Sequence, residues 1–181
     1  AAGYEQAMEA SDAKYKVYLH QDVFIVYEHF IEDILEIFKE KDIGMIGMVG
    51  TVKLPEDGVM WHDEESRCGK VRYNCILEES ISDFSVPIVG KYKEVQAVDG
   101  LLMATSVDIP WRMDIFKGWD FYDVSQSMEF RKAEYRVVVP NQKIPWCIHD
   151  EDVMHLDSYE HWRKVFIENY GIISGGFEDE E

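Results

Sequence analysis

The chain has 181 residues, a length typical of one domain, and its 46% apolar content is enough for a hydrophobic core. Acidic residues outnumber basic ones 36 to 18, and the net charge of -18 argues against a nucleic-acid partner, because a phosphate backbone is bound through Lys and Arg. Three cysteines without a Cys-x-x-Cys pair indicate reduced thiols in a cytoplasmic protein, and no apolar run reaches the ~18 residues of a membrane span.

The first part of the chain predicts alternating helices and strands. Residues 2–10 are rich in Ala, Glu and Met and predict a helix, and residues 14–19 predict a strand. Apolar residues at steps of three and four predict a second helix over 26–41, and Ile-Gly-Met-Ile-Gly-Met-Val at 43–49 predicts a buried strand. This order is typical of a βαβ unit, so we expect an α/β fold with a mainly parallel central sheet flanked by helices.

The second part of the chain predicts a loop over 53–70 and then further elements. These are a small antiparallel region within 94–106, a helix over 121–133, a strand over 135–139, and an amphipathic helix through Tyr159, Trp162, Phe166 and Tyr170.

We expect one domain over residues 1–173 and an acidic, flexible tail over 174–181. The chain begins with Ala inside a predicted helix, so we also expect a segment upstream of it.

His20-Gln21-Asp22 follows the predicted strand 14–19 directly. Ligands of open α/β sheets bind at the carboxyl ends of strands, where an imidazole and a carboxylate two residues apart could face a cation or a diphosphate. The alternative is that Asp22 caps the following helix, because an N-cap Asp accepts backbone N–H bonds. Spacing alone favours the cap.

Asp99-Gly100 lies between two apolar runs, a pattern typical of a hairpin turn. The alternative is functional: Asp99 lines a substrate cleft and Gly100 lets the backbone approach a sugar closely. Without further information the turn is favoured.

The stretch Gly118-Trp119-Asp120-Phe121-Tyr122-Asp123 combines two carboxylates with three aromatic rings just before a predicted helix. Asp123 could act as a general base for a hydroxyl group, and Trp119 or Tyr122 could stack on a sugar ring. In the structural alternative Asp120 caps the helix and Trp119 packs in the core. Both interpretations stay open, because one capping carboxylate does not explain two.

His149 ends an apolar stretch, and a histidine in such a place is more often an ordinary side chain than a ligand. Cys147 would share its face in a strand, but no third residue stands out that could orient a Cys-His nucleophile. Arg112, after Pro110-Trp111, could contact phosphate or acceptor, although surface packing explains it and the cluster Trp61-His62 equally well.

Several short motifs occur in an order that resembles the bacterial family of glycosyltransferase-2-like proteins, some of which carry a hemagglutinin-like label. The resemblance covers about residues 1–170 and implies a GT-A-like fold without the first βα units, which hold the nucleotide base. The motifs that carry it are His-Gln-Asp-Val, Ile-Gly-Met-Ile-Gly, Met-Trp, Asp-Gly-Leu-Leu, Ile-Pro-Trp-Arg, Gly-Trp-Asp-Phe-Tyr-Asp and Trp-Cys-Ile-His-Asp.

The same resemblance implies roles for individual residues. His-Gln-Asp is similar to the Asp-x-Asp metal motif of GT-A transferases, with His20 in the place of the first Asp, which implies that Asp22 binds the divalent ion that bridges the donor diphosphate. His149 resembles the late histidine that completes the metal site. Asp123 is implied as the catalytic base, and Asp99-Gly100 looks like the acceptor-side Asp-Gly of these enzymes.

We therefore expect a metal-dependent, inverting glycosyltransferase that moves a sugar from a nucleotide-diphosphate donor to a saccharide or another hydroxyl acceptor. Mn²⁺ or Mg²⁺ would be held by Asp22, His149 and His20, with Asp123 as the base. The alternative is a non-catalytic carbohydrate-binding or adhesion module on the same fold, and a metal-dependent hydrolase has thinner support. Substrate contacts are expected from Asp99, Gly100, Trp119, Tyr122 and Arg112.

Overall fold

The computed structural model describes residues 1–75, 78–150 and 156–171, and it confirms a mixed α/β fold. The helices are α1 (Ala2–Glu9), α2 (Phe30–Ile37), α3 (Tyr122–Lys132) and α4 (Tyr159–Tyr170), with 3-10 turns at Met60–His62 and Glu64–Ser66. The strands are β1 (Lys16–Leu19), β2 (Val23–Ile25), β3 (Ile43–Gly47), β4 (Val49–Thr51), β5 (Arg67–Cys75), β6 (Glu78–Asp83), β7 (Tyr92–Val95), β8 (Ala97–Val98), β9 (Leu102–Thr105), β10 (Arg136–Pro140) and β11 (Cys147–His149).

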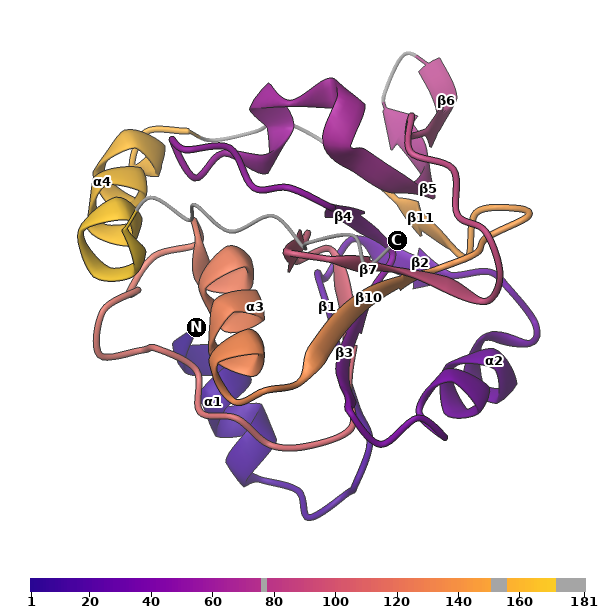
Figure 1. The fold of residues 1–181 in the computed structure, drawn as a ribbon, viewed down its shortest axis with the longest axis horizontal. Helices are drawn as coiled ribbons and strands as arrows, with labels where there is room; N and C mark the ends of the chain where they lie inside the picture. The colour runs from indigo at the N-terminus through magenta and orange to yellow at the C-terminus, as the bar shows by residue number, and fades with distance from the viewer. Residues whose placement is uncertain (76–77, 151–155, 172–181) are drawn as a thin grey trace, which may run out of the picture.

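The strands form two sheets that share one interior (Figure 1). The first sheet has the order β1-β9-β3-β10-β7, and the second has the order β2-β11-β5-β4-β8 with β6 on β5. In the described part of the chain the parallel pairs are β3 with β10 and β5 with β11, and the other pairs are antiparallel. The expectation of a mainly parallel sheet is therefore corrected to a mostly antiparallel arrangement.

The predicted βαβ unit shows where that expectation went wrong. Strands β1 and β3, joined through α2, do run in the same direction, because each pairs antiparallel with β9. However, β9 lies between them and separates the two strands that the pattern placed side by side. Local periodicity predicts strands and crossovers, but it does not show that a buried strand from more distant sequence will insert between them.

The helices cover the sheets on different sides. In Figure 1, α1, α3 and α4 lie on the left and α2 lies at the lower right. Helix α2 buries Phe30, Ile34 and Ile37, and each such side chain contributes about 1.5–3 kcal/mol of hydrophobic free energy. Ile31 and Leu35 of the predicted stripe are exposed, so the buried face is narrower and the helix shorter than predicted.

The predicted hairpin at Asp99-Gly100 is not formed. Strand β8 before it pairs with β4, whereas β9 after it pairs with β1 and β3, so the dipeptide connects the two sheets. The Asp99 side chain accepts a hydrogen bond from the Leu101 N–H at 2.8 Å, which stabilises the turn locally.

Most other predicted elements are present with shorter bounds. The predicted loop over 53–70 contains the two 3-10 turns and the start of β5. Residues 172–181 lie outside the described residues, so the acidic tail and the domain over 1–173 stay predictions.

Candidate active site

A cleft of about 960 Å³ lies where β1, β8 and β11 end and α3 begins. The loop over 58–62, strand β5 and the start of α4 supply its other walls. Its lining contains these residues from the sequence-based prediction: His20, Asp22, Asp99, Trp119, Tyr122, Asp123 and His149.

Two backbone features bring Asp22 and His149 together. After β1 the chain makes a tight turn in which the Val23 N–H donates to the His20 carbonyl oxygen at 3.2 Å. Strand β2 then pairs antiparallel with β11, so that His149 lies opposite Val23 and the Asp150 N–H donates to the Asp22 carbonyl oxygen at 2.8 Å. The pairing of β2 with β11 therefore brings Asp22 and His149, which are far apart in sequence, close together.

His20, Asp22 and His149 form a compact cluster. Each offers one ligand atom, and these atoms lie within 4.8 Å of one another. His149 Nε2 is 3.5 Å from Asp22 Oδ1, and this carboxylate oxygen is buried without a hydrogen-bond partner among the described residues. A buried carboxylate oxygen without a donor is costly, so the cluster fits a cation that would supply the missing charge.

The N-cap interpretation of Asp22 is wrong. Asp22 precedes β2, and the residue at the N-cap of α2 is His29. The Asp22 carboxylate therefore does not cap α2, which is the role that spacing alone favoured.

Tyr122 contacts one of these cluster residues. Its hydroxyl oxygen lies 2.5 Å from His20 Nε2, and burial raises the pKa of the hydroxyl well above its ordinary value, so the group stays neutral. Gly100 makes room for this contact, because a Cβ there would overlap with the Tyr122 hydroxyl. The close approach that was expected of Gly100 is made by a tyrosine of the chain itself.

Asp123 lies next to Tyr122 in the same cleft. Burial raises the pKa of its carboxyl above the ordinary value, although hydrogen bonds from the N–H groups of Val124 and Gly100, both at 2.8 Å, stabilise the carboxylate. A carboxylate with a raised pKa is a better proton acceptor, which is what a general base requires.

The start of α3 is conformationally unusual. Phe121 precedes the helix with φ of 61°, in the left-handed region that a bulky aromatic residue rarely adopts. Its ring is buried and packs against Tyr159 and Phe166, which holds the backbone in this conformation. Strained residues of this kind occur at functional sites, and Tyr122 and Asp123, which follow Phe121 directly, both line the cleft.

Trp119 and Asp120 do not have the structural roles considered for them. The Trp119 side chain is 79% exposed, so it does not pack in the core. The Asp120 carboxylate accepts a hydrogen bond from the Ser158 hydroxyl at 2.7 Å, and Phe121 occupies the N-cap position of α3.

Arg112 is not among the residues that line the cleft. Its guanidinium pairs with Asp114 at 2.9 Å and with Glu129 at 3.5 Å. Cys147 is fully buried, and burial raises the pKa of its thiol to about 12, which argues against a Cys-His nucleophile.

Residues 1–170 match the model of a glycosyltransferase-like family. The chain belongs to this family. Membership supports glycosyl transfer and a classification as a transferase. No curated protein matched the chain.

Some cleft residues of this glycosyltransferase-like chain had no predicted role. Tyr73, Asp150 and Tyr159 line the cleft, as do Trp61 and His62. The cluster Trp61-His62 was visible in the sequence, but it carried no signal for this particular site. Tyr73 lies in the unpredicted strand β5 and Tyr159 reads as one apolar residue of an amphipathic helix, so only the tertiary fold places them here.

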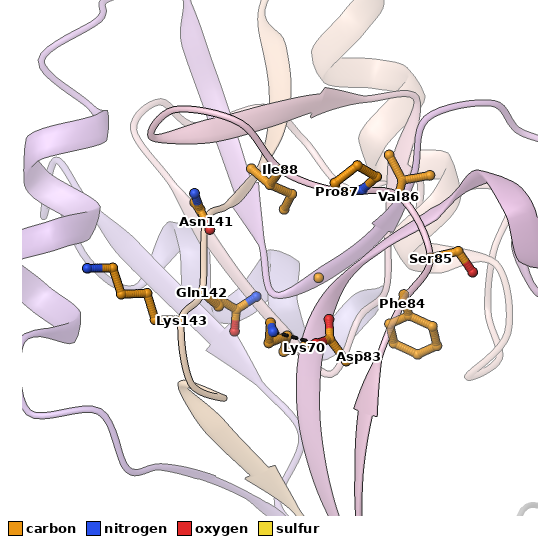
Figure 2. A pocket seen from close by; sticks show the side chains of 11 residues that line it. Lys70, Asp83, Phe84, Ser85, Val86, Pro87, Ile88, Asn141, Gln142 and Lys143 are labelled. Atoms are coloured by element: carbon orange, nitrogen blue, oxygen red, sulfur yellow. Dashed lines mark hydrogen bonds and ion pairs between the residues drawn. The ribbon is translucent and has the colours of Figure 1, made fainter.

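A second hollow of about 520 Å³ lies between residues 83–88 and 141–143 (Figure 2). Lys70 pairs there with Asp83, and the buried Gln142 amide donates to the Met48 carbonyl oxygen at 2.7 Å. The amino group of Lys143 points away from this pair. Because its inward polar groups are satisfied within the chain, this hollow is a weaker candidate than the cleft.

None of the helices in the described ranges has the length and apolar character needed to cross a membrane.

Proposed function

We propose that this chain transfers a sugar from a nucleotide-diphosphate donor to a hydroxyl acceptor, with a divalent cation and with inversion at the anomeric carbon. The observation that carries the proposal is the buried Asp22 Oδ1, which has no hydrogen-bond partner among the described residues and lies beside two imidazoles. Asp123 opens into the same cleft, and membership of a glycosyltransferase-like family supports the reaction class.

Asp22, His20 and His149 would hold the cation. Carboxylate and imidazole together suit Mn²⁺ better than Mg²⁺, which prefers oxygen ligands. When bound, the ion supplies positive charge that neutralises the diphosphate leaving group.

Asp123 would act as the base. The acceptor hydroxyl oxygen forms a bond to the anomeric carbon, and the bond from that carbon to the diphosphate oxygen breaks with its electron pair on the nucleotide. The hydroxyl proton passes to the Asp123 carboxylate. Attack opposite the leaving group inverts the configuration, and the raised pKa of Asp123 favours the proton transfer.

Acceptor positioning would fall to Asp99 and Trp119, which both line the cleft. An exposed indole ring offers a flat apolar face for a sugar ring, and orientation of the acceptor contributes a large part of such catalysis. Arg112 has no part in this proposal, because its guanidinium is held by acidic residues away from the lining. Tyr122, which also lines the cleft, would position His20 through its hydroxyl group.

The metal role is tested by calorimetric titration of Mn²⁺ with nucleoside diphosphates into the wild type and into Asp22→Ala. We expect the variant to lose most of the Mn²⁺-dependent nucleotide binding. Asp12→Ala is a matched control, because it removes an exposed carboxylate that does not line the cleft. Equal binding by wild type and Asp22→Ala would remove Asp22 from the metal site.

The role of Asp123 is tested by turnover of nucleotide-sugar donors in Asp123→Asn, with wild-type folding checked by thermal unfolding. We expect nucleotide binding to persist while turnover falls at least 100-fold, the scale of a general base. A near-native rate would show that another group accepts the proton.

The second candidate function is a carbohydrate-binding module without catalysis, which the exposed indole of Trp119 in the cleft favours. Glycan binding that is unaffected by a chelator, together with no Mn²⁺-dependent nucleotide binding, would support the module over the enzyme.

A further inference from the structure

Carboxylates outnumber histidines on the described lining of the cleft, five to three. Among its described lining residues there is no Lys or Arg. The carboxylates that line it are Asp22, Asp99, Asp120, Asp123 and Asp150.

Two of these carboxylates interact with neutral groups in the contacts that the structure shows. Asp120 accepts a hydrogen bond from the Ser158 hydroxyl at 2.7 Å, and Asp150 accepts one from the Asn74 amide at 2.8 Å. Neutral donors orient a carboxylate, but they do not cancel its charge. The electrostatic potential near these two carboxylates is therefore negative.

Two arginines near the cleft interact with other partners. Arg163 pairs with Glu160 at 2.6 Å and donates to the Asp57 carbonyl oxygen. Arg67 lies over the ring of Trp61, with its guanidinium carbon 5.5 Å from the ring centroid, and pairs with Glu64. Neither guanidinium lines the cleft, and each is paired with a carboxylate.

An exposed aromatic ring and one of the carboxylates are consecutive in the chain. Trp119 presents a largely exposed indole, and Asp120 follows it directly in the chain. Because both residues line the cleft, a saccharide stacked on the indole would share the cleft with the Asp120 carboxylate. Hydroxyl or ammonium groups could donate to that carboxylate, whereas a uronate or phosphate group would be repelled by it.

We propose that the cleft selects an acceptor saccharide that is uncharged or carries an amine, that it rejects uronate and phosphate-bearing saccharides, and that Asp120 determines this preference. The inference rests on the proposed function, since it names the acceptor class of that site. The divalent cation that the proposed function places there would face the donor diphosphate, so the negative field would remain for the acceptor.

The first experiment measures binding of the wild-type chain, in the presence of a chelator, to a glycan array with size-matched neutral, amino and uronate members. We expect the bound glycans to be neutral or amino, with at least tenfold weaker binding of their uronate counterparts at low salt. This ratio should shrink at high salt, because screening weakens electrostatic repulsion. Equal or stronger binding of uronate members, or binding of none of the glycans, would overturn the proposal.

The second experiment assigns the preference to Asp120 by calorimetry with the best neutral glycan and its uronate counterpart. Asp120→Asn keeps an oxygen that can accept the Ser158 hydrogen bond, so folding should be retained, and thermal unfolding checks this. We expect the neutral-to-uronate ratio to fall at least threefold. The control Glu32→Gln removes one exposed charge from α2, which does not line the cleft, and should leave the ratio unchanged. An equal effect of both variants would overturn the role of Asp120.

Failure of this proposal and failure of the proposed function give different results. A missing charge preference with intact Mn²⁺-dependent nucleotide binding would overturn only the acceptor class. Loss of nucleotide binding with an intact charge preference would overturn the transferase proposal.

Discussion

The hydroxyl oxygen of Tyr122 lies 2.5 Å from His20 Nε2, so a residue at the start of α3 contacts a candidate metal ligand at the end of β1. Histidines that bind metals commonly use their second ring nitrogen to donate to an oxygen atom, which fixes the tautomer and the ring orientation. Tyr122 can accept such a bond from Nε2 and leave Nδ1 for the cation. We therefore regard Tyr122 as a positioning residue for His20.

The first prediction concerns Tyr122→Phe, which keeps the ring and removes the hydroxyl. We expect Mn²⁺ affinity to fall about 10–100-fold, the usual effect of losing a partner of a metal-binding histidine. Calorimetric titration measures it. Tyr27→Phe is the matched control. It removes a hydroxyl that donates to the Asp33 carboxylate at 2.8 Å, and Tyr27 does not line the cleft. This variant should bind Mn²⁺ as the wild type does. Identical affinity of both variants would contradict the positioning role.

The second prediction concerns Gly100→Ala. The new methyl group would overlap with the Tyr122 hydroxyl, so we expect a loss of about 1–3 kcal/mol in the free energy of unfolding and weaker Mn²⁺ binding. Gly3→Ala is the control, because no atom lies within 4 Å of a Cβ built there. Adding Tyr122→Phe to Gly100→Ala should restore part of the stability, since it removes the overlapping oxygen. Strictly additive losses in denaturant unfolding would contradict the clash.

The third prediction concerns pH. Burial raises the pKa of Asp123 in the folded state above the ordinary value of 3.8, so the folded chain holds this proton more tightly than the unfolded chain does. The contribution of Asp123 to stability is therefore greatest at low pH, falls as pH rises from about the ordinary pKa through the raised folded pKa, and is constant above it. Asp123→Asn lacks this titration. Unfolding measured across this range should show the wild type losing stability relative to Asp123→Asn as pH rises, and a relative gain would contradict the raised pKa.

The fourth prediction concerns the thiols of Cys68 and Cys147. Both are buried, and burial raises the pKa of each to about 12, so little thiolate forms near neutral pH. Iodoacetamide should label them slowly in the folded chain and rapidly after unfolding in denaturant, as peptide mass spectrometry can measure. Rapid native labelling of Cys147 would reopen the Cys-His nucleophile.

Much of the fold was predictable because its signals are local. The apolar spacing in α4 and the aromatic and β-branched residues of β1 and β10 can be read from the chain. The position of β9 between β1 and β3 was not predictable, because it depends on pairing between strands that are distant in sequence. The same limit explains why the hairpin expected at Asp99-Gly100 does not form. Strand β8 before the dipeptide pairs with β4, and strand β9 after it pairs with β3.

The candidate site was predictable in part. Motif order pointed to Asp22, Asp123 and His149, which all line one cleft, but not to the contact between Tyr122 and His20. Arg112 follows Trp111 in the sequence, and nothing in that local pattern shows that its guanidinium forms ion pairs with Asp114 and Glu129. Tyr73 and Tyr159 enter the cleft only through tertiary packing.

Pulsed electron paramagnetic resonance of Mn²⁺ bound to the wild-type chain with a nucleoside diphosphate tests the proposed metal centre most directly. We predict nitrogen couplings from directly bound imidazoles, weaker in His149→Ala and His20→Ala, and loss of the bound ion in Asp22→Ala. Mn²⁺ with oxygen ligands alone, or spectra unchanged in all three variants, would contradict a metal centre formed by these side chains.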